Sequence, residues 1–423
     1  MDQDWLAVFE ALRSVYTEGA FSNTAISEAV SRHKTARESF VRTFAKGVIR
    51  DSIRLDHIID SLAAKGIKSI KPRPLIIIRM GIYAAGSLGS VPEHAAVNEA
   101  VRLAKGVAKG SDRFVNGMLR SYLRRSGEFD AEKLEPHIRY SFSKETFDLL
   151  CRQYGEEAIH IMEALNEPPA LYLRANTLKA SRDEVINMLR SDGFEAEAAG
   201  DASEGIKASG SGIISGRLFR EGWLSVQSLS SMMAVKAFSP AAGSRVLDMC
   251  AAPGGKTAYM AELMKNRGEI IACDIYPHRA ELIEAAMKRT GVSIVKTRVA
   301  DASLYESGFE AAFDYVLCDV PCSGLGVIGS KPEIKLTTDT SRYKDLTELQ
   351  GKILGNALRY VKPGGRVMYS TCTLNRDENE FLVKDILSKN HGSLSIIELV
   401  TLLPYNGKVG FFYGIIEKNR FID

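Results

Sequence analysis

The segment Leu247-Asp-Met-Cys-Ala-Ala-Pro-Gly-Gly-Lys-Thr257 carries the most structural information in this 423-residue chain. It begins within Arg245–Met249, a short apolar run typical of a buried strand, and leads into Thr257–Lys265, which has the pattern of a helix. Gly254 and Gly255 let a ligand approach the backbone closely, and the start of a helix offers free N–H donors. The segment therefore predicts a strand, a ligand-binding turn and a helix.

The spacing of this turn argues against two common nucleotide-binding loops. A P-loop requires a glycine five residues before the glycine of Gly-Lys-Thr, and Cys250 stands there. The G-x-G-x-x-G spacing of a dinucleotide site is also missing. We therefore expect a smaller nucleoside ligand, bound by the loop residues Cys250, Ala251, Ala252, Pro253, Gly254, Gly255 and Lys256.

Strands and helices alternate through the rest of the C-terminal part. This alternation predicts a doubly wound α/β sheet, which binds its ligands at the carboxyl ends of the strands. The further expected elements are the strands Glu269–Asp274, Val295–Val299, Phe313–Asp319 and Arg366–Ser370 and the helix Arg279–Arg289.

Acidic residues stand at the ends of two of these strands. Asp274 ends the second strand and is suited to accept both ribose hydroxyls of a nucleoside. Asp301 follows the third strand and is suited to accept an adenine amino group. The alternative for Asp301, which precedes Ala-Ser, is a helix cap. Together with the glycine loop after the first strand, these two acids make three candidate ligand contacts at successive strand ends, which favours a nucleoside pocket.

Two of the six cysteines, Cys322 and Cys372, follow directly on strand ends. A thiolate is soft and nucleophilic and is well suited to attack an electron-poor ring carbon. The other cysteines fall in expected strands or helices, where cysteine acts as a small hydrophobe. Zinc is disfavoured because Cys318 and Cys322 lack C-x-x-C spacing and no histidine is near. The irregular spacing also argues against a disulfide framework.

The N-terminal part predicts an all-α bundle, with helical stretches at Asp4–Glu18, Phe40–Leu62, Ala95–Ala104 and Arg113–Leu123. Glycines and prolines, among them those at 66, 72, 74 and 86, are interpreted as breaks between helices. A small α+β module follows, in which Ser181 and Glu184 form an expected capping box. The expected domains are residues 1–140, 141–235 and 236–423.

The positive charge of the chain is concentrated at its N-terminal end. Residues 1–140 hold 22 Lys+Arg against 16 Asp+Glu, whereas residues 141–423 hold 33 against 36. The segment from Arg102 to Arg125 contains seven cationic residues and one acid, Asp112. Such a cluster is typical of a polyanion-binding surface, and the alternative is a solvated helix face. With 45% hydrophobic and 25% charged residues and no predicted leader or membrane span, we expect a cytoplasmic globular protein.

Three segments together resemble the RNA 5-methylcytosine methyltransferases of the Nop/Sun type. They are Cys250–Thr257, Asp319-Val-Pro-Cys-Ser-Gly324 and Ser370-Thr-Cys-Thr373, and within that group the chain is most similar to the bacterial RsmB (Sun/Fmu) family. The resemblance covers nearly the whole chain. Segments 91–101 and 114–120 resemble its NusB-like RNA-binding domain, and segments 173–178 and 226–227 its connecting module.

The resemblance implies a Rossmann-like class I methyltransferase domain behind a NusB-like bundle and a small α+β module. It implies methyl transfer from S-adenosylmethionine to C5 of a position-967-type cytosine in 16S ribosomal RNA, in an unassembled or partly assembled small subunit. In this family pattern Cys372 would add to C6, and Asp319 would hold the N3 and amino edge of the base. Cys322 would assist removal of the C5 proton and release of the enzyme.

The resemblance also implies where cofactor and RNA bind. Residues 250–256, Asp274, Asp301 and Asp319 would line the S-adenosylmethionine pocket. Arg113, Arg120, Lys331 and Lys335 are expected RNA contacts, although a solvated loop is the alternative for the Lys331-Pro-Glu-Ile-Lys335 run. Neither a metal nor a membrane is expected, and the protein is expected to be a monomer.

Three positions depart from the family pattern. Ser228 stands where the family usually has Asp, Ser143 lies in a segment without the usual Pro-Trp element, and Val409 stands where an acid is usual. Other interpretations also remain: the same chemistry on transfer RNA or another RNA, DNA methylation with Cys322 as nucleophile, or a non-catalytic RNA-binding factor. The DNA interpretation requires Cys372 to be dispensable.

Overall fold

The computed structural model describes residues 2–33, 35, 37–336, 341–389 and 393–420. The chain forms two compact units. The first unit comprises the described residues up to 167 together with residues 328–336, and the second comprises the remaining described residues.

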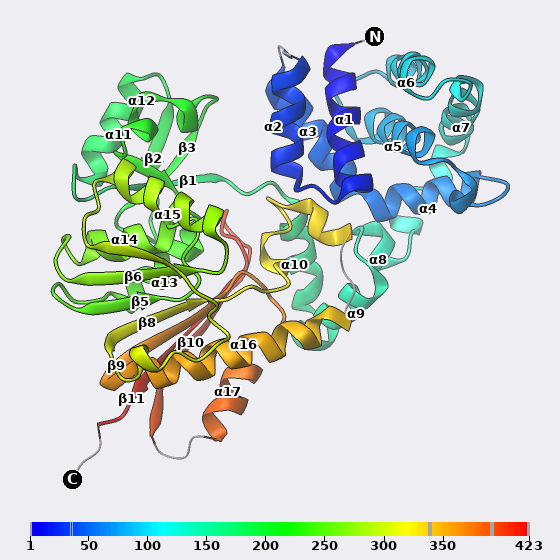
Figure 1. Ribbon diagram of the computed structural model, residues 1–423. Helices are drawn as coiled ribbons and strands as arrows, with labels where there is room; N and C mark the ends of the chain where they lie inside the picture. Colours follow the sequence, from blue (N-terminus) through cyan, green and yellow to red (C-terminus); the bar gives the residue numbers. More distant parts are fainter. Residues whose placement is uncertain (1, 34, 36, 337–340, 390–392, 421–423) are drawn as a thin grey trace. The chain divides into compact units, whose positions relative to one another are not determined.

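The regular structure of the first unit is helical throughout its described residues. At the first helix, the Asp2 side chain accepts the backbone N–H groups of Asp4 and Trp5, and Gly19 ends the helix in a left-handed conformation (φ 69°). The helices are α1 (Gln3–Glu18), α2 (Ser22–His33), α3 (Glu38–Arg50), α4 (Ser52–Leu62), α5 (Pro72–Ser87), α6 (Glu93–Val107), α7 (Asp112–Arg125), α8 (Pro136–Arg139), α9 (Lys144–Tyr154) and α10 (Glu157–Asn166) (Figure 1).

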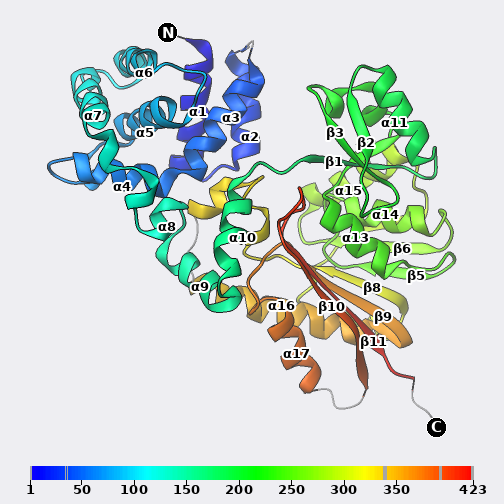
Figure 2. The ribbon, with the colours of Figure 1, turned by 180° about the vertical axis from the view of Figure 1, so that it is seen from behind.

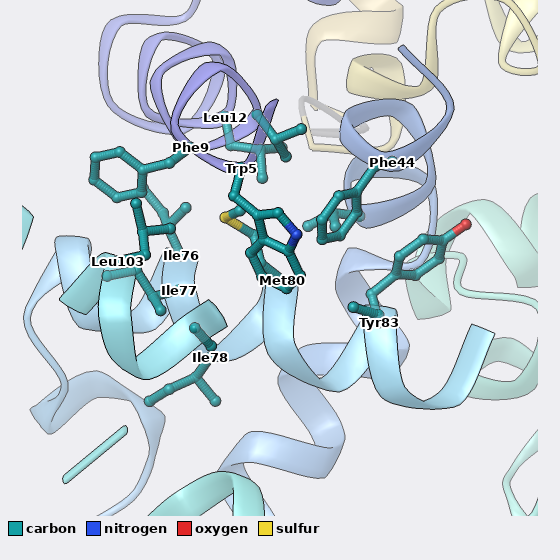
Figure 3. Packing of buried hydrophobic residues seen from close by; sticks show 14 of the residues in the cluster. Trp5, Phe9, Leu12, Phe44, Ile76, Ile77, Ile78, Met80, Tyr83 and Leu103 are labelled. Carbon is teal, nitrogen blue, oxygen red and sulfur yellow. The ribbon is translucent and has the colours of Figure 1, made fainter. Parts of the chain in front are cut away.

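An aromatic cluster lies at the centre of this unit (Figure 3). The Trp5 ring meets the Phe44 ring edge-on, with 4.9 Å between centroids, and Phe44 stacks on Tyr83 at 6.0 Å. Gly47 lets α3 approach α5, because a Cβ there would lie 2.0 Å from the Tyr83 hydroxyl oxygen. The expected all-α bundle is confirmed.

Two details of the first unit differ from the sequence prediction. The expected helix Phe40–Leu62 consists of two helices, α3 and α4, which meet at Asp51. The prolines at 72 and 74 do not break the chain; they lie in the first turn of α5, where a missing N–H group costs no intrahelical hydrogen bond. A helix that the sequence prediction missed therefore fills the centre of the bundle.

The second unit contains a seven-stranded sheet in the order β10-β11-β9-β8-β5-β6-β7. Strands β9, β8, β5, β6 and β7 run parallel, and β11 pairs antiparallel with both β9 and β10. Figure 2 shows the β10 and β11 edge. The strands are β5 (Arg245–Asp248), β6 (Glu269–Asp274), β7 (Val295–Val299), β8 (Phe313–Asp319), β9 (Val361–Thr371), β10 (Leu394–Leu402) and β11 (Phe411–Lys418).

Helices cover both faces of this sheet (Figures 1 and 2). Successive strand residues point to opposite faces, so Val246 packs in one core while Leu247 packs in the other. The first core contains α13 (Leu229–Phe238), α14 (Gly255–Leu263) and α15 (Pro277–Thr290), and the second contains α16 (Ser341–Tyr360) and α17 (Glu380–Ser388). The doubly wound sheet is therefore confirmed.

A four-stranded antiparallel sheet, in the order β2-β3-β1-β4, precedes the large sheet. The expected capping box is present, since Ser181 and Glu184 each accept the other's backbone N–H. Arg174 on β1 joins this module to α14 through an ion pair with Glu262 at 2.7 Å, and both side chains are buried. The elements are β1 (Leu171–Ala175), α11 (Arg182–Ser191), β2 (Glu195–Ala198), β3 (Gly205–Ser209), α12 (Arg217–Arg220) and β4 (Leu224–Val226).

Candidate active site

The carboxyl ends of β5, β8 and β9 bring the expected catalytic side chains together. In the parallel register, Asp319 at the end of β8 stands opposite Ser370 on β9. The Ser370 hydroxyl donates to Asp319 Oδ1 at 2.7 Å. Lys256, in the first turn of α14, donates to Asp319 Oδ2 at 2.7 Å. Both oxygens of Asp319 are thereby oriented at this edge of the sheet.

Lys256 is a cation between two acidic groups of the site. Burial disfavours its charged form, but the Asp319 charge and hydrogen bond outweigh burial, and negative charge on Cys372 adds to them. The pKa of Lys256 is consequently raised above its ordinary value. By the same attraction, the Lys256 ammonium favours the thiolate of Cys372.

The two cysteines expected to react lie side by side. The Sγ atoms of Cys322 and Cys372 are 3.3 Å apart, and both residues are only partly buried. The hydrogen bond with Cys372, together with burial, raises the pKa of the Cys322 thiol well above its ordinary value. One sulfur of the pair is thus held as a thiol beside a second sulfur that interacts with a cation.

Burial also raises the pKa of three other cysteines in this domain, Cys250, Cys273 and Cys318. For Cys273 the pKa is about 12. The Cys318 thiol donates to the sulfur of Met249, also inside the fold. Burial is the largest influence on each of these thiols, so they act as small core residues, in accordance with the comparison of the six cysteines in the sequence.

The loop after β5 has the open geometry that its glycines suggest. Gly254 adopts φ 96°, and a Cβ on it would lie 3.4 Å from the Cα of Ile283 on α15. Gly255 begins α14, and no side chain caps this helix end. Arg279 donates to the Ala252 carbonyl at 3.1 Å and thus fixes the outer part of the loop.

Asp274 and Asp301 lie at adjacent strand ends, as expected. Asp274 is 3% exposed and forms an ion pair with Arg279 at 3.4 Å. One oxygen of Asp301 accepts both the backbone N–H and the hydroxyl of Ser303. Asp301 therefore caps a local turn and not a helix, which the alternative interpretation expected, and its second oxygen does not take part in that cap.

Asp248, the last residue of β5, was not predicted as a site residue. This carboxyl is 1% exposed and accepts a hydrogen bond from Thr257 at 2.7 Å. Burial, aided by the Asp319 charge, raises the pKa of Asp248 to about 7. Its position directly before the glycine loop could have revealed it, but its burial depends on the assembled sheet. Glu378, a buried carboxylate beside the cysteines, was missed for the same reason.

The four expected RNA contacts have different environments. Arg113 and Arg120 are exposed on α7, and Lys331 is exposed as well. Lys335 is only 3% exposed, and its ammonium donates to the carbonyls of Arg50 and Tyr140 and to the side chain of Asn166. The first unit thus surrounds Lys335, and the expected contact with RNA phosphate is not compatible with this burial.

The three departures from the family pattern have local structural roles. The Ser228 side chain caps α13 by accepting the Ser231 N–H, and Ser143 caps α9 in the same way. The Val409 carbonyl accepts a hydrogen bond from Ser230 at 2.7 Å. Serine at 228 therefore keeps the helix-capping capacity that aspartate would provide.

Within the described ranges, no three or more His, Cys, Asp or Glu side chains are grouped as a metal site requires. None of the described helices combines the length and apolarity that crossing a bilayer demands.

Three protein-family models match successive parts of the chain. The model described as 16S rRNA methyltransferase RsmB/F matches residues 235–410, the NusB family model matches residues 5–124, and the RsmF/B-like ferredoxin-like domain model matches residues 147–212. The order of the three matches follows the bundle, the small sheet and the large sheet.

Similar proteins span almost the whole chain. The probable ribosomal RNA small subunit methyltransferase B of Bacillus subtilis is 33% identical, over 93% of this chain and 90% of its own. The probable protein of the same name from Synechocystis is also 33% identical, over 97% and 98%. The crystal structure of PH0851 superposes with a TM-score of 0.83 at 27% identity and covers 99% of each chain. On this agreement over its full length, the chain belongs to the RsmB/Sun family of small-subunit ribosomal RNA methyltransferases.

Proposed function

We propose that this protein transfers a methyl group from S-adenosylmethionine to C5 of a cytosine in 16S ribosomal RNA through a covalent bond between Cys372 and C6. The observation that carries the proposal is the 3.3 Å pair of thiols, Cys322 and Cys372, beside the Lys256–Asp319 ion pair. Methylation at C5 requires one group to activate the ring and another to remove the C5 proton. The two sulfurs are suited to these two roles.

The residues present fit S-adenosylmethionine. Asp274 offers a buried carboxylate for the ribose hydroxyls, and Gly254, at φ 96°, supplies a left-handed turn without a side chain in the loop before α14. Asp301 keeps one oxygen outside its local cap for the adenine amino group. When bound, S-adenosylmethionine supplies an electrophilic methyl group.

The first chemical step belongs to Cys372. The Lys256 ammonium favours its thiolate, which adds to C6 of the base, and a sulfur–carbon bond forms as the C5–C6 double bond opens. C5 becomes electron-rich and would take the methyl group as the bond between the methyl carbon and the sulfonium sulfur breaks, which would leave S-adenosylhomocysteine. Asp319, oriented by Ser370 and Lys256, holds the amino and N3 edge of the base: it accepts from the amino group, and from N3 once N3 has taken up a proton from solvent during the addition at C6.

Cys322 acts after the addition. Before Cys372 bonds to the base, its hydrogen bond and charge raise the pKa of Cys322 and keep it protonated. The thioether formed at Cys372 no longer has either effect, so Cys322 releases its proton to solvent more readily. Its thiolate then takes the C5 proton, the C5–C6 double bond re-forms, and Cys372 leaves as a thiolate.

The first unit offers cationic and polar groups that are suited to an RNA substrate. The segments 91–101 and 114–120 both contribute to a surface cavity of about 360 Å³ in this unit. Its lining includes His94, Asn98, Arg120 and Arg124, which offer two cations and further polar groups to RNA. Arg113 is exposed on the same helix as Arg120. The target cytosine must be unstacked to reach both sulfur and cofactor, which favours a loop.

The test of this proposal is a map of the modified base. The protein is incubated with labelled S-adenosylmethionine and, separately, unmodified 16S ribosomal RNA, transfer RNA and DNA of the 16S sequence. Bisulfite sequencing should then find 5-methylcytosine at one position of the 16S RNA. Label at C5 of transfer RNA or DNA alone would replace the proposed substrate, and label on another atom would overturn the C5 chemistry.

A further inference from the structure

Glu378 is a buried carboxylate for which the proposed chemistry has no direct use. It lies between β9 and α17 and is 0% exposed. Donor groups surround it: the Ser323 N–H at 2.9 Å and the Gln350 amide at 2.9 Å reach Oε2, and the Ser323 hydroxyl and the Asn375 amide at 3.1 Å reach Oε1. Every one of these groups donates to Glu378, as an acceptor-only carboxylate requires.

These hydrogen bonds reach both cysteine loops. Ser323 directly follows Cys322, and Thr373 directly follows Cys372. The Ser323 and Thr373 hydroxyls are hydrogen-bonded to each other at 2.6 Å. Glu378 holds Ser323 through both its backbone and its side chain. A short chain of hydrogen bonds therefore runs from the buried carboxylate through Ser323 to the residue beside the second cysteine.

Other hydrogen bonds also hold the cysteine loops: on either side of Cys372, the Thr371 hydroxyl donates to Asn379 at 2.6 Å and the Asn379 amide donates to the Thr373 carbonyl at 3.0 Å. The Gly326 N–H donates to the Cys372 carbonyl at 3.0 Å, which joins the loops on their backbone side. The Gln350 amide bridges Glu378 and the carbonyl of Pro321, the residue before Cys322. Glu378 thus contacts groups that fix the residues on both sides of Cys322.

We infer that Glu378 is a positioning residue that sets the separation of the Cys322 and Cys372 sulfurs through Ser323, Thr373 and Gln350. For catalysis, this inference rests on the proposed cysteine mechanism. The separation matters because the sulfur that adds to C6 and the sulfur that takes the C5 proton act on adjacent ring atoms. A displacement of either loop by about 1 Å costs on the order of a hundredfold in rate.

Glutamine is the informative substitution at this position. Its side chain has nearly the shape of glutamate but presents an NH₂ group where one carboxylate oxygen stood. The new NH₂ group would face two other donors, which are either the Ser323 N–H and the Gln350 amide or the Ser323 hydroxyl and the Asn375 amide. Because donors cannot bond to a donor, those two groups would move away from residue 378. Aspartate keeps the charge and both acceptors at a slightly shorter reach.

The experiment compares the full-length wild type with Glu378→Gln, Glu378→Asp and a control, Glu204→Gln. Glu204 is also a buried carboxylate, 9% exposed, with partners Tyr259, Lys236 and Ser203 away from the cysteines. Diamide, an azo oxidant, takes up two electrons and two protons as the two thiols join. The rate of Cys322–Cys372 disulfide formation, followed by peptide mass spectrometry, reports sulfur proximity without any methyl transfer.

Glu378→Gln should slow disulfide formation and lower kcat roughly tenfold to a hundredfold. KM for RNA and the Kd for S-adenosylmethionine should stay within about twofold of the wild type, and Glu378→Asp should recover part of both rates. Glu204→Gln should leave the disulfide rate unchanged. An unchanged disulfide rate or an unchanged kcat in Glu378→Gln would overturn the inference.

A second variant covers a failure of Glu378→Gln to fold. The pair Ser323→Ala with Thr373→Val keeps Glu378 and removes the link between the loops, and it should reduce both rates in the same way. Cys372→Ala is assayed beside these variants. Methylation that survives in Cys372→Ala would refute the proposed function, whereas the disulfide rates would still decide whether Glu378 sets the geometry.

Discussion

Replacement of Asp248 by asparagine should remove a specific pH dependence from the stability of the second unit. Asp248 is 1% exposed, and burial raises its pKa from an ordinary 3.8 to about 7. Between these two pH values the folded protein binds a proton that the unfolded chain has already released. The contribution of Asp248 to the free energy of unfolding is therefore fully present below pH 4 and is lost as the pH rises toward 7.

The size of the effect follows from the width of this window. From pH 5 to pH 8 the unfolded carboxyl is ionised throughout, while the folded carboxyl stays protonated up to about pH 7. Two pH units at about 1.4 kcal/mol each lower the free energy of unfolding of the wild type by about 3 kcal/mol. The asparagine side chain keeps an oxygen that can accept from Thr257 but does not titrate, so Asp248→Asn should escape this loss.

Urea unfolding at pH 5, 6, 7 and 8 measures the difference. The chain has two tryptophans, so in a Trp5→Phe background the fluorescence of Trp223 reports on the second unit alone. Asp314→Asn is the matched control. Burial tends to raise the pKa of Asp314, but hydrogen bonds from Arg245 and Lys362 outweigh burial and lower this pKa. The stabilisation that the Asp314 carboxylate provides is lost only at lower pH. The difference in the free energy of unfolding between Asp314→Asn and the wild type should therefore stay constant from pH 5 to 8. A flat difference for Asp248→Asn as well would refute the reasoning.

Three further perturbations test other parts of the account. Arg113→Gln with Arg120→Gln should weaken RNA binding and lower its salt slope by about two, as filter binding at several KCl concentrations would detect; an unchanged slope would remove α7 from the interface. Burial lowers the pKa of Lys335 to about 7, so protonation of this side chain costs the folded state stability as the pH falls from about 10 to 7. Lys335→Met should therefore stabilise the first unit more at pH 7 than at pH 10. Equal gains in the free energy of unfolding by urea at the two pH values would contradict this. Arg174→Met leaves Glu262 buried without its cation and should lower the free energy of unfolding of the second unit by about 3 to 5 kcal/mol. A second substitution, Glu262→Met, should restore most of this free energy. If urea unfolding of the double variant shows no such gain, the ion pair is not the cause of the loss.

Several elements of the large sheet could be predicted to the residue. The strands Glu269–Asp274, Val295–Val299 and Phe313–Asp319 match the expected bounds. Each ends where acidic or turn-forming residues follow an apolar run, so local patterns determine these ends. The C-terminal strands β10 and β11 were not predicted. Strand β10 is largely exposed or half-buried and lacks a continuous apolar run, whereas β11 is apolar and buried, and its pattern could have indicated a strand.

Errors arose where distant contacts outweigh local pattern. The Lys331–Lys335 run is highly charged and looks solvated, yet the first unit buries Lys335. The error at the prolines at 72 and 74 has a local cause: proline is favoured in the first turn of a helix, and these two begin α5. For the candidate site, the glycine loop indicated Lys256, the strand ends indicated the two cysteines, and the resemblance to the RsmB family indicated Asp319. Burial of Asp248 and Glu378 depends on side chains far away in the chain, so no local motif reveals it.

The most direct measurement for the cysteine mechanism uses Cys322→Ala with S-adenosylmethionine and total RNA from cells that lack this enzyme. Without the base that removes the C5 proton, the Cys372–C6 bond should persist, and a denaturing gel should contain a protein–RNA adduct whose RNA identifies the target. The adduct should disappear in Cys322→Ala with Cys372→Ala. An adduct that persists without Cys372, or methylation that is unaffected by Cys372→Ala alone, would contradict the account.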